Sequence, residues 1–199
     1  MQIGSINFGF EIENKGDSPS LIHQVHENRI QLAEESPGRA DGVGTFHHRQ
    51  PIYVFTADCL PVFLFSDGPK DPILALHCGW RGALSEIVAK GIEWMNLPAA
   101  QIHAILGPSI GPCCMNVRYD FVDTFEKVGK NITPYLRQKD EGMTFDLPQF
   151  VIETQLHQLP LKQIHLDYQR CTFCSLPQLP SFRRNGNTQI RLKNWVCKS

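Results

Sequence analysis

The sequence predicts a single α+β domain, covering residues 1–199, in which mixed β-sheets are flanked by helices. The length is sufficient for one domain with a sizeable core and short for two. Strand-like apolar runs and helical patterns alternate irregularly, without the strand–helix rhythm of a doubly wound fold. No linker, internal repeat or low-complexity block divides the chain, so we expect one continuous core.

The predicted strands are mostly continuous apolar runs, which are typical of strands buried on both faces. An N-terminal stretch within residues 1–12 is predicted as an edge strand. The tail after Cys171 is predicted to be rich in loops. The core strands are expected at residues 52–55, 62–65, 73–77, 102–106 and 164–168.

Three helices are predicted from apolar spacing and capping residues. Apolar side chains recur at helical intervals over about residues 82–95, directly after His77. A second helix is expected at about residues 117–128. The third should begin at Asp146, a favourable N-cap followed by proline in the first turn, and run to about residue 158.

The composition argues against several classes of function. A formal net charge of −1 provides no basic surface for nucleic acid. No apolar run reaches the ~18–20 residues that span a bilayer, and no signal peptide is evident, so a cytoplasmic location is expected. The odd number of cysteines, seven, favours reduced thiols over a disulfide framework.

His26, Cys59 and His77 are the candidate metal ligands. Three N and S ligands with a fourth position left open match the stoichiometry of a catalytic zinc site, although the spacing is too wide for a zinc finger. Cys59 and His77 alone also match the nucleophile–base pair of a cysteine hydrolase. Judged from these residues alone, a buried core thiol is the favoured interpretation of Cys59. Asp58 is expected to brace its loop, because consecutive strand residues point to opposite faces.

Phosphate could bind where the glycine-flanked segment 79–82 opens a helix. Free N–H groups there, together with Arg81, favour anions, and Arg183 and Arg184 could add to the site. A helix start carrying a surface arginine is the alternative interpretation.

Two further cysteine patterns receive no firm function from the sequence. Cys171 and Cys174 have CxxC spacing, but they have no second CxxC partner and are followed by prolines. The vicinal Cys113 and Cys114 are expected to pack beside the site.

Several motifs occur together and in order, and with them the chain resembles the YfiH-like, laccase-domain family, once called multicopper polyphenol oxidases. The motifs cover about residues 21–186. They are Gln24-Val25-His26, Ala40-Asp41-Gly42, Thr56-Ala57-Asp58-Cys59-Leu60-Pro61, His77-Cys78-Gly79-Trp80-Arg81-Gly82, Gly107-Pro108-Ser109-Ile110-Gly111-Pro112-Cys113-Cys114, and Cys171-Thr172 followed by Ser181-Phe182-Arg183-Arg184.

The resemblance implies a cysteine-hydrolase-like fold and Zn²⁺ held by the positions matching His26, Cys59 and His77. It implies purine nucleosides and phosphate as substrates: phosphorolysis of adenosine, inosine, guanosine or methylthioadenosine, and deamination of adenosine. In such an enzyme Asp58 and Asp41 would support the metal ligands, and Asp41 could carry a proton. Copper is the less favoured metal, because the dense histidine clusters of multicopper sites are missing.

The chain departs from the family pattern in three places. Residues 10–17 lack a Thr-Arg-x-Gly-Gly segment, Met115-Asn116 replaces Tyr-Glu, and residues 186–189 replace a Thr-Gly-Arg segment. The alternatives to a zinc nucleoside enzyme are a metal-free cysteine hydrolase or deamidase using Cys59 and His77, a copper polyphenol oxidase, and a non-enzymatic interaction protein.

Overall fold

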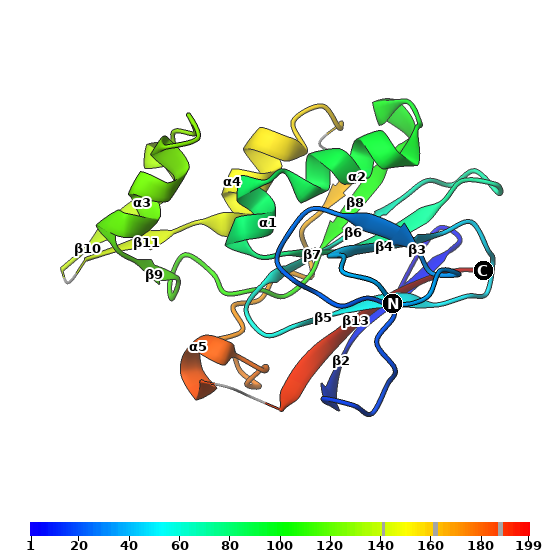
Figure 1. Ribbon diagram of the computed structural model, residues 1–199, viewed down its shortest axis with the longest axis horizontal. Helices are drawn as coiled ribbons and strands as arrows, with labels where there is room; N and C mark the ends of the chain where they lie inside the picture. The colour runs from blue at the N-terminus through cyan, green and yellow to red at the C-terminus, as the bar shows by residue number, and fades with distance from the viewer. Residues whose placement is uncertain (141, 161–162, 187–188) are drawn as a thin grey trace.

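Two sheets stacked face to face, with helices on the outer face of the larger one, form the body of the molecule (Figure 1). The structure is a computed structural model that describes residues 1–140, 142–160, 163–186 and 189–199. The architecture confirms the predicted α+β domain with mixed sheets. The longest helices described, α2 and α4, have nine residues each, and no described helix is suited to crossing a bilayer.

The larger sheet is mixed and carries the centre of the fold. Its outer pairs, β12–β8 and β3–β4, are parallel, and its inner pairs are antiparallel. In spatial order its six strands are β12 (Ile164–His165), β8 (His103–Leu106), β6 (Leu60–Phe65), β7 (Ile73–Cys78), β4 (Gly42–Thr45) and β3 (Ile30–Leu32).

Both faces of this sheet are buried, as the continuous apolar runs predict. Val62 and Leu64 of β6 pack into the core under the helices, whereas Phe63 and Phe65 pack into the core under the smaller sheet. Alternate residues of a strand point to opposite faces, so a strand with a core on each side must be apolar throughout.

The smaller, four-stranded sheet corrects two predictions. In order its strands are β1 (Gln2–Ile3), β2 (Ile6–Asn14), β13 (Ile190–Lys198) and β5 (Ile52–Thr56). The predicted loop-rich tail therefore ends in a central strand, along which Leu192, Asn194 and Val196 are buried at every second position. The single edge strand predicted within residues 1–12 is instead a pair: the two-residue β1 forms the edge of the sheet, and β2 lies between β1 and β13.

The helix predicted over residues 82–95 is broken into α1 (Trp80–Leu84) and α2 (Ile87–Met95), with Glu86 in the left-handed region at φ 64°. Gln155 explains the break. Its Oε1 accepts the Val88 N–H at 3.0 Å and its Nε2 donates to the Ala83 carbonyl at 2.8 Å. The side chain thus provides hydrogen bonds to both helix ends that a continuous helix would have made internally.

The other two predicted helices are present with shorter bounds, as α3 (Tyr119–Glu126) and α4 (Leu147–Gln155). The Asp146 carboxylate accepts the Gln149 N–H at 3.2 Å, as expected of an N-cap. A third sheet was not predicted. It comprises β10 (Leu136–Lys139), β11 (Gly142–Phe145) and β9 (Asn116–Val117). A separate short helix, α5, spans Phe182–Asn185.

Replacing Gln155 by Leu should destabilise the protein by roughly 2–4 kcal/mol. The buried Val88 N–H loses its acceptor, at about 1–3 kcal/mol, and the Ala83 carbonyl loses one of its two donors, at about 1 kcal/mol, while keeping the Glu86 N–H. Chemical denaturation measures the change. Gln149→Leu, on the exposed side of the same helix, is the matched control and should stay within about 0.5 kcal/mol. Equal losses in the two variants would contradict the role given to Gln155.

Candidate metal centre

The structure brings the three predicted metal ligands together. The ligand atoms of His26, Cys59 and His77 all lie within 4.8 Å of one another. His26 is exposed, Cys59 is partly buried and His77 is buried, so the group opens to solvent on the His26 side. Cys59 lies just before β6, and His77 lies near the end of β7, where the register pairs Pro61 with His77. The antiparallel pairing places both at the same edge of the sheet.

Asp41 positions two of these residues. Its fully buried carboxylate accepts the consecutive backbone N–H groups of Val25, His26 and Glu27 at 2.8–3.1 Å. The same carboxylate accepts His77 Nδ1 at 2.7 Å. His26 has a φ of 64°, and the three N–H bonds hold that left-handed turn in place.

The contact with Asp41 also fixes the tautomer of His77. When Nδ1 carries the proton and donates it to Asp41, the lone pair of Nε2 is free for a metal ion. A carboxylate–histidine pair of this kind is a common support for a metal ligand. The donor set of two imidazoles and one thiolate fits Zn²⁺, and it also occurs in copper sites.

Gly79 allows the close approach of these side chains. A Cβ at this position would lie 3.0 Å from Cys59 Sγ and 3.1 Å from His26 Cδ2. Any larger residue at position 79 would therefore displace the side chains of Cys59 and His26.

Cys59 and His77 shift each other's protonation. Burial opposes ionisation of both groups, but their mutual attraction outweighs it. The positive charge of His77 lowers the pKa of Cys59 to about 6. The thiolate and the Asp41 carboxylate raise the pKa of His77 to about 9. Without metal, the pair is therefore a thiolate and an imidazolium near neutral pH.

Asp58 holds neighbouring loops, as expected from the sequence. Its carboxylate accepts the Thr172 hydroxyl and the Arg183 N–H, both at 2.6 Å. Its carbonyl accepts the Ile110 N–H at 2.9 Å. The strained φ of 92° at Asp58 is thus fixed by contacts on three sides, directly beside Cys59.

The three candidate phosphate-binding arginines are in different situations. Arg81 lies at the start of α1, with its guanidinium 4.1 Å from the Trp80 ring centroid. The Arg183 guanidinium donates to the Asn116 carbonyl at 2.9 Å. Arg184 donates to backbone carbonyls of Thr172, Phe173 and Leu179, so its guanidinium is used to hold the loop that follows Cys171.

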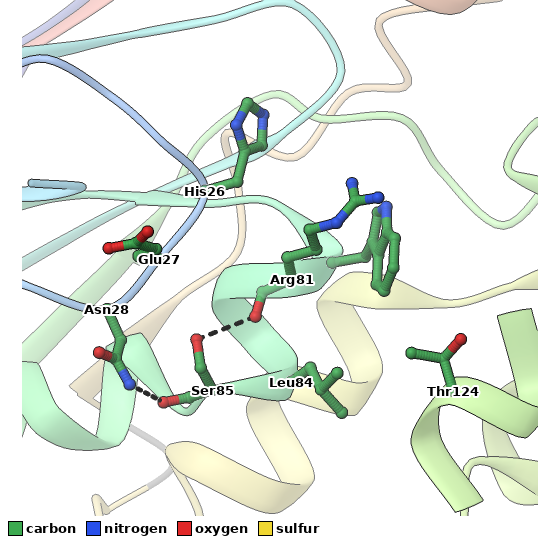
Figure 2. A pocket seen from close by; sticks show the side chains of 8 residues that line it. His26, Glu27, Asn28, Arg81, Leu84, Ser85 and Thr124 are labelled. Carbon is green, nitrogen blue, oxygen red and sulfur yellow. Dashed lines mark hydrogen bonds between the residues drawn. The ribbon is translucent and has the colours of Figure 1, made fainter. Parts of the chain in front are cut away.

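A surface pocket of about 460 Å³ adjoins the site at His26 (Figure 2). In Figure 2, Arg81 lies between His26 and Thr124, which comes from α3 across the pocket. Trp80 also lines the pocket. Asn28 donates to the Ser85 carbonyl at 2.5 Å and connects the His26 segment to the end of α1. Neither Asn28 nor Thr124 was predicted from the sequence. The packing of α3 beside α1 brings Thr124 to the pocket, and Asn28 is held there by its bond to Ser85.

The three departures from the family pattern lie in different places. Residues 10–14 belong to strand β2. Met115 is buried in the core below the helices, and Asn116 contributes the carbonyl that binds Arg183. Part of the third departure, Asn187 and Thr188, lies outside the described residues.

A family model for the multi-copper polyphenol oxidoreductase laccase matches residues 10–197. The chain belongs to this laccase family. It is 33% identical over 177 residues to a purine nucleoside phosphorylase of Aquifex aeolicus, covering 87% of this chain and 80% of that protein. It is 30% identical over 175 residues to a purine nucleoside phosphorylase of Haemophilus influenzae, covering 86% of this chain and 71% of that protein.

A solved structure shows the same fold. The crystal structure of the Bacillus licheniformis protein YfiH superposes with a TM-score of 0.76 at 23% identity, and the match covers 88% of this chain and 72% of that one. The resemblance expected from the motifs is thereby confirmed.

The thiolate–imidazolium pair of this laccase-family protein predicts a pH-dependent reactivity. In metal-free protein, alkylation of Cys59 by iodoacetamide should rise with a midpoint near pH 6, the pKa of its thiol. Asp41→Asn should move the midpoint upward, because it weakens the imidazolium that stabilises the thiolate. Peptide mass spectrometry measures the rate at each pH.

Cys197 serves as an internal control for this experiment, because burial raises the pKa of its thiol. It should react only at a higher pH. A midpoint for Cys59 above that of an ordinary free thiol would contradict the predicted pair.

The same pair contributes to the free energy of unfolding of the metal-free protein. The contribution of the Cys59 thiolate is lost as pH falls through about 6, and the contribution of the His77 imidazolium is lost as pH rises through about 9.

Proposed function

We propose that this chain is a purine nucleoside phosphorylase whose active centre is formed by His26, Cys59 and His77. The observation that carries the proposal is the convergence of these three ligands beside a pocket, in a chain whose relatives bear that name. The pocket volume of about 460 Å³ lies within the range of small-molecule sites. The seven free cysteines favour a reducing, cytoplasmic location.

His26, Cys59 and His77 would hold one Zn²⁺, with a position left open toward the pocket. When bound, such an ion supplies a Lewis acid that polarises an oxygen of a substrate or lowers the pKa of water. Zinc is favoured over a multicopper centre because, across the described residues, neither cluster of three or more potential ligands contains more than two histidines. Dense histidine clusters would favour copper.

The chain's own residues would bind and orient the substrates. The Trp80 ring and the Arg81 guanidinium line the pocket next to His26, and a guanidinium is suited to phosphate. Arg183, held beside Asp58, is a second phosphate candidate. Arg184 is the weaker candidate, because it already binds three carbonyls.

Asp41 is best understood as a positioning residue. It is fully buried and accepts four N–H groups. Burial alone would raise the pKa of its carboxyl, but the hydrogen bonds, led by that from His77, lower it. A carboxylate stabilised in this way is a poor proton carrier, and it keeps His77 oriented and His26 in its turn.

We further propose that the site accepts adenosine, inosine, guanosine and methylthioadenosine, and that it deaminates adenosine. Phosphorolysis replaces the C1′–N bond by a C1′–O bond to phosphate and releases the base. Deamination adds water at C6 and releases ammonia. Adenosine is the substrate that the two proposed reactions share.

A metal-free cysteine hydrolase or deamidase is the second candidate function. The thiolate–imidazolium pair of Cys59 and His77, with Asp41 behind the imidazole, favours it. The decisive difference is His26, which is a metal ligand in the first candidate and lies outside the catalytic pair in the second.

Incubation with adenosine, inosine or methylthioadenosine should release free base only when phosphate is present, as measured by chromatography. Inosine formed from adenosine without phosphate would report deamination. Absence of both reactions in the zinc-loaded protein at micromolar concentration would refute the nucleoside proposal and favour an interaction protein.

Both Cys59→Ala and His26→Ala should lower the rate of phosphorolysis at least about 100-fold, because each removes a direct ligand of the metal. His23→Ala is the matched control, since His23 is an exposed histidine three residues away, and it should retain full activity. Retention of turnover by His26→Ala, with loss in Cys59→Ala, would instead indicate the metal-free cysteine mechanism.

A further inference from the structure

Four cysteines from the two segments that contact Asp58 meet in a second cluster. The Sγ atoms of Cys113, Cys114, Cys171 and Cys174 all lie within 4.8 Å of one another. The Cys113 and Cys174 sulfurs are 3.5 Å apart. In a tetrahedral zinc site with Zn–S bonds of about 2.3 Å, neighbouring sulfurs are about 3.8 Å apart. This four-cysteine cluster therefore has nearly the spacing that a bound ion requires.

The backbone turns both pairs of thiols toward one point. Residues 112–114 form a turn, in which the Cys114 N–H donates to the Gly111 carbonyl at 2.9 Å. Adjacent side chains diverge in an extended strand, so the turn is what lets both vicinal cysteines contribute. Cys171 and Cys174 are also in a turn, closed by the Ser175 N–H at the Cys171 carbonyl, 3.0 Å.

The two segments are joined next to the cluster. Ser109 accepts the Thr172 N–H at 3.0 Å and donates its own N–H to the Arg170 carbonyl at 3.1 Å. The Gly111 N–H donates to Cys171 Sγ at 3.3 Å, a contact that stabilises a thiolate. A Cβ on Gly111 would lie 3.3 Å from Cys113 Sγ and 3.4 Å from Cys171 Cβ. A glycine is therefore what permits this close approach.

We propose that the four-cysteine cluster binds a second Zn²⁺ as a closed, tetrathiolate structural site. Four sulfur ligands leave no open coordination position, which is the arrangement of structural rather than catalytic zinc. The site is distinct from the group of His26, Cys59 and His77 and does not depend on the proposed nucleoside chemistry.

The proposed ion would stabilise the loops that hold Asp58. One linked segment contains Ile110, whose N–H binds the Asp58 carbonyl, and the other contains Thr172, whose hydroxyl binds the Asp58 carboxylate. Cys59 follows Asp58 directly. A metal in the four-cysteine cluster would thus fix the backbone on which a ligand of the first site is mounted.

Elemental analysis of the full chain, purified under reducing conditions and loaded with zinc, tests the proposal. Wild type should hold about two zinc ions, Cys174→Ser about one and Cys59→Ala about one. Cys197→Ser, which alters a cysteine outside both clusters, is the control and should retain about two. Cys174 is exposed, so its substitution should not prevent folding.

Cobalt substitution distinguishes the two sites by their ligands. Thiolate-to-cobalt charge-transfer absorption grows with the number of thiolates, so Cys174→Ser should lose most of it and Cys59→Ala should retain most. A wild-type content of about one zinc that Cys174→Ser leaves unchanged would overturn the proposal. Iron in the cluster, or a Cys113–Cys174 disulfide in mass spectra of the reduced preparation, would overturn it as well.

Discussion

The candidate site depends on the hydrogen bonds that the buried carboxylate of Asp41 accepts. Removing a carboxylate from water is costly unless hydrogen bonds replace the lost hydration. Here four N–H groups do so, three from the turn at His26 and one from the His77 ring. The Asp41 carbonyl additionally accepts the His77 N–H at 2.7 Å. One residue therefore sets the backbone of one candidate ligand and the ring orientation of another.

The central sheet positions the third candidate ligand, Cys59. Antiparallel pairing of β6 with β7 aligns Leu60 with Cys78 and Pro61 with His77. Cys59, which directly precedes β6, therefore lies next to the end of β7, where His77 is located. Both strands are buried on each face, which makes this edge rigid. The exposed His26 and the pocket beside it add the open side that a reactive centre needs.

Asp58 connects this centre to the rest of the C-terminal segment. Its carboxylate binds Thr172 and Arg183, whereas its neighbour Cys59 faces the histidines. The four cysteines lie in the segments that Asp58 joins. The fold therefore links two sulfur-containing clusters to one strained residue. One cluster is open and has mixed donors, and the other is composed of thiols alone.

The sequence by itself determined the core strands β5 to β8, because a strand buried on both faces must be apolar throughout, and it determined the helix start at Asp146, because capping is local. The strand predicted over residues 164–168 is only the partly buried edge strand β12 (Ile164–His165). It also indicated His26, Cys59 and His77 through their motifs. Only the tertiary structure revealed β13, whose buried Asn194 and intervening charges conceal a central strand, and the break between α1 and α2, which is caused by Gln155 of a distant helix. The four-cysteine cluster was likewise invisible, because its two halves are far apart in the chain and are brought together by the contacts around Ser109 and Gly111.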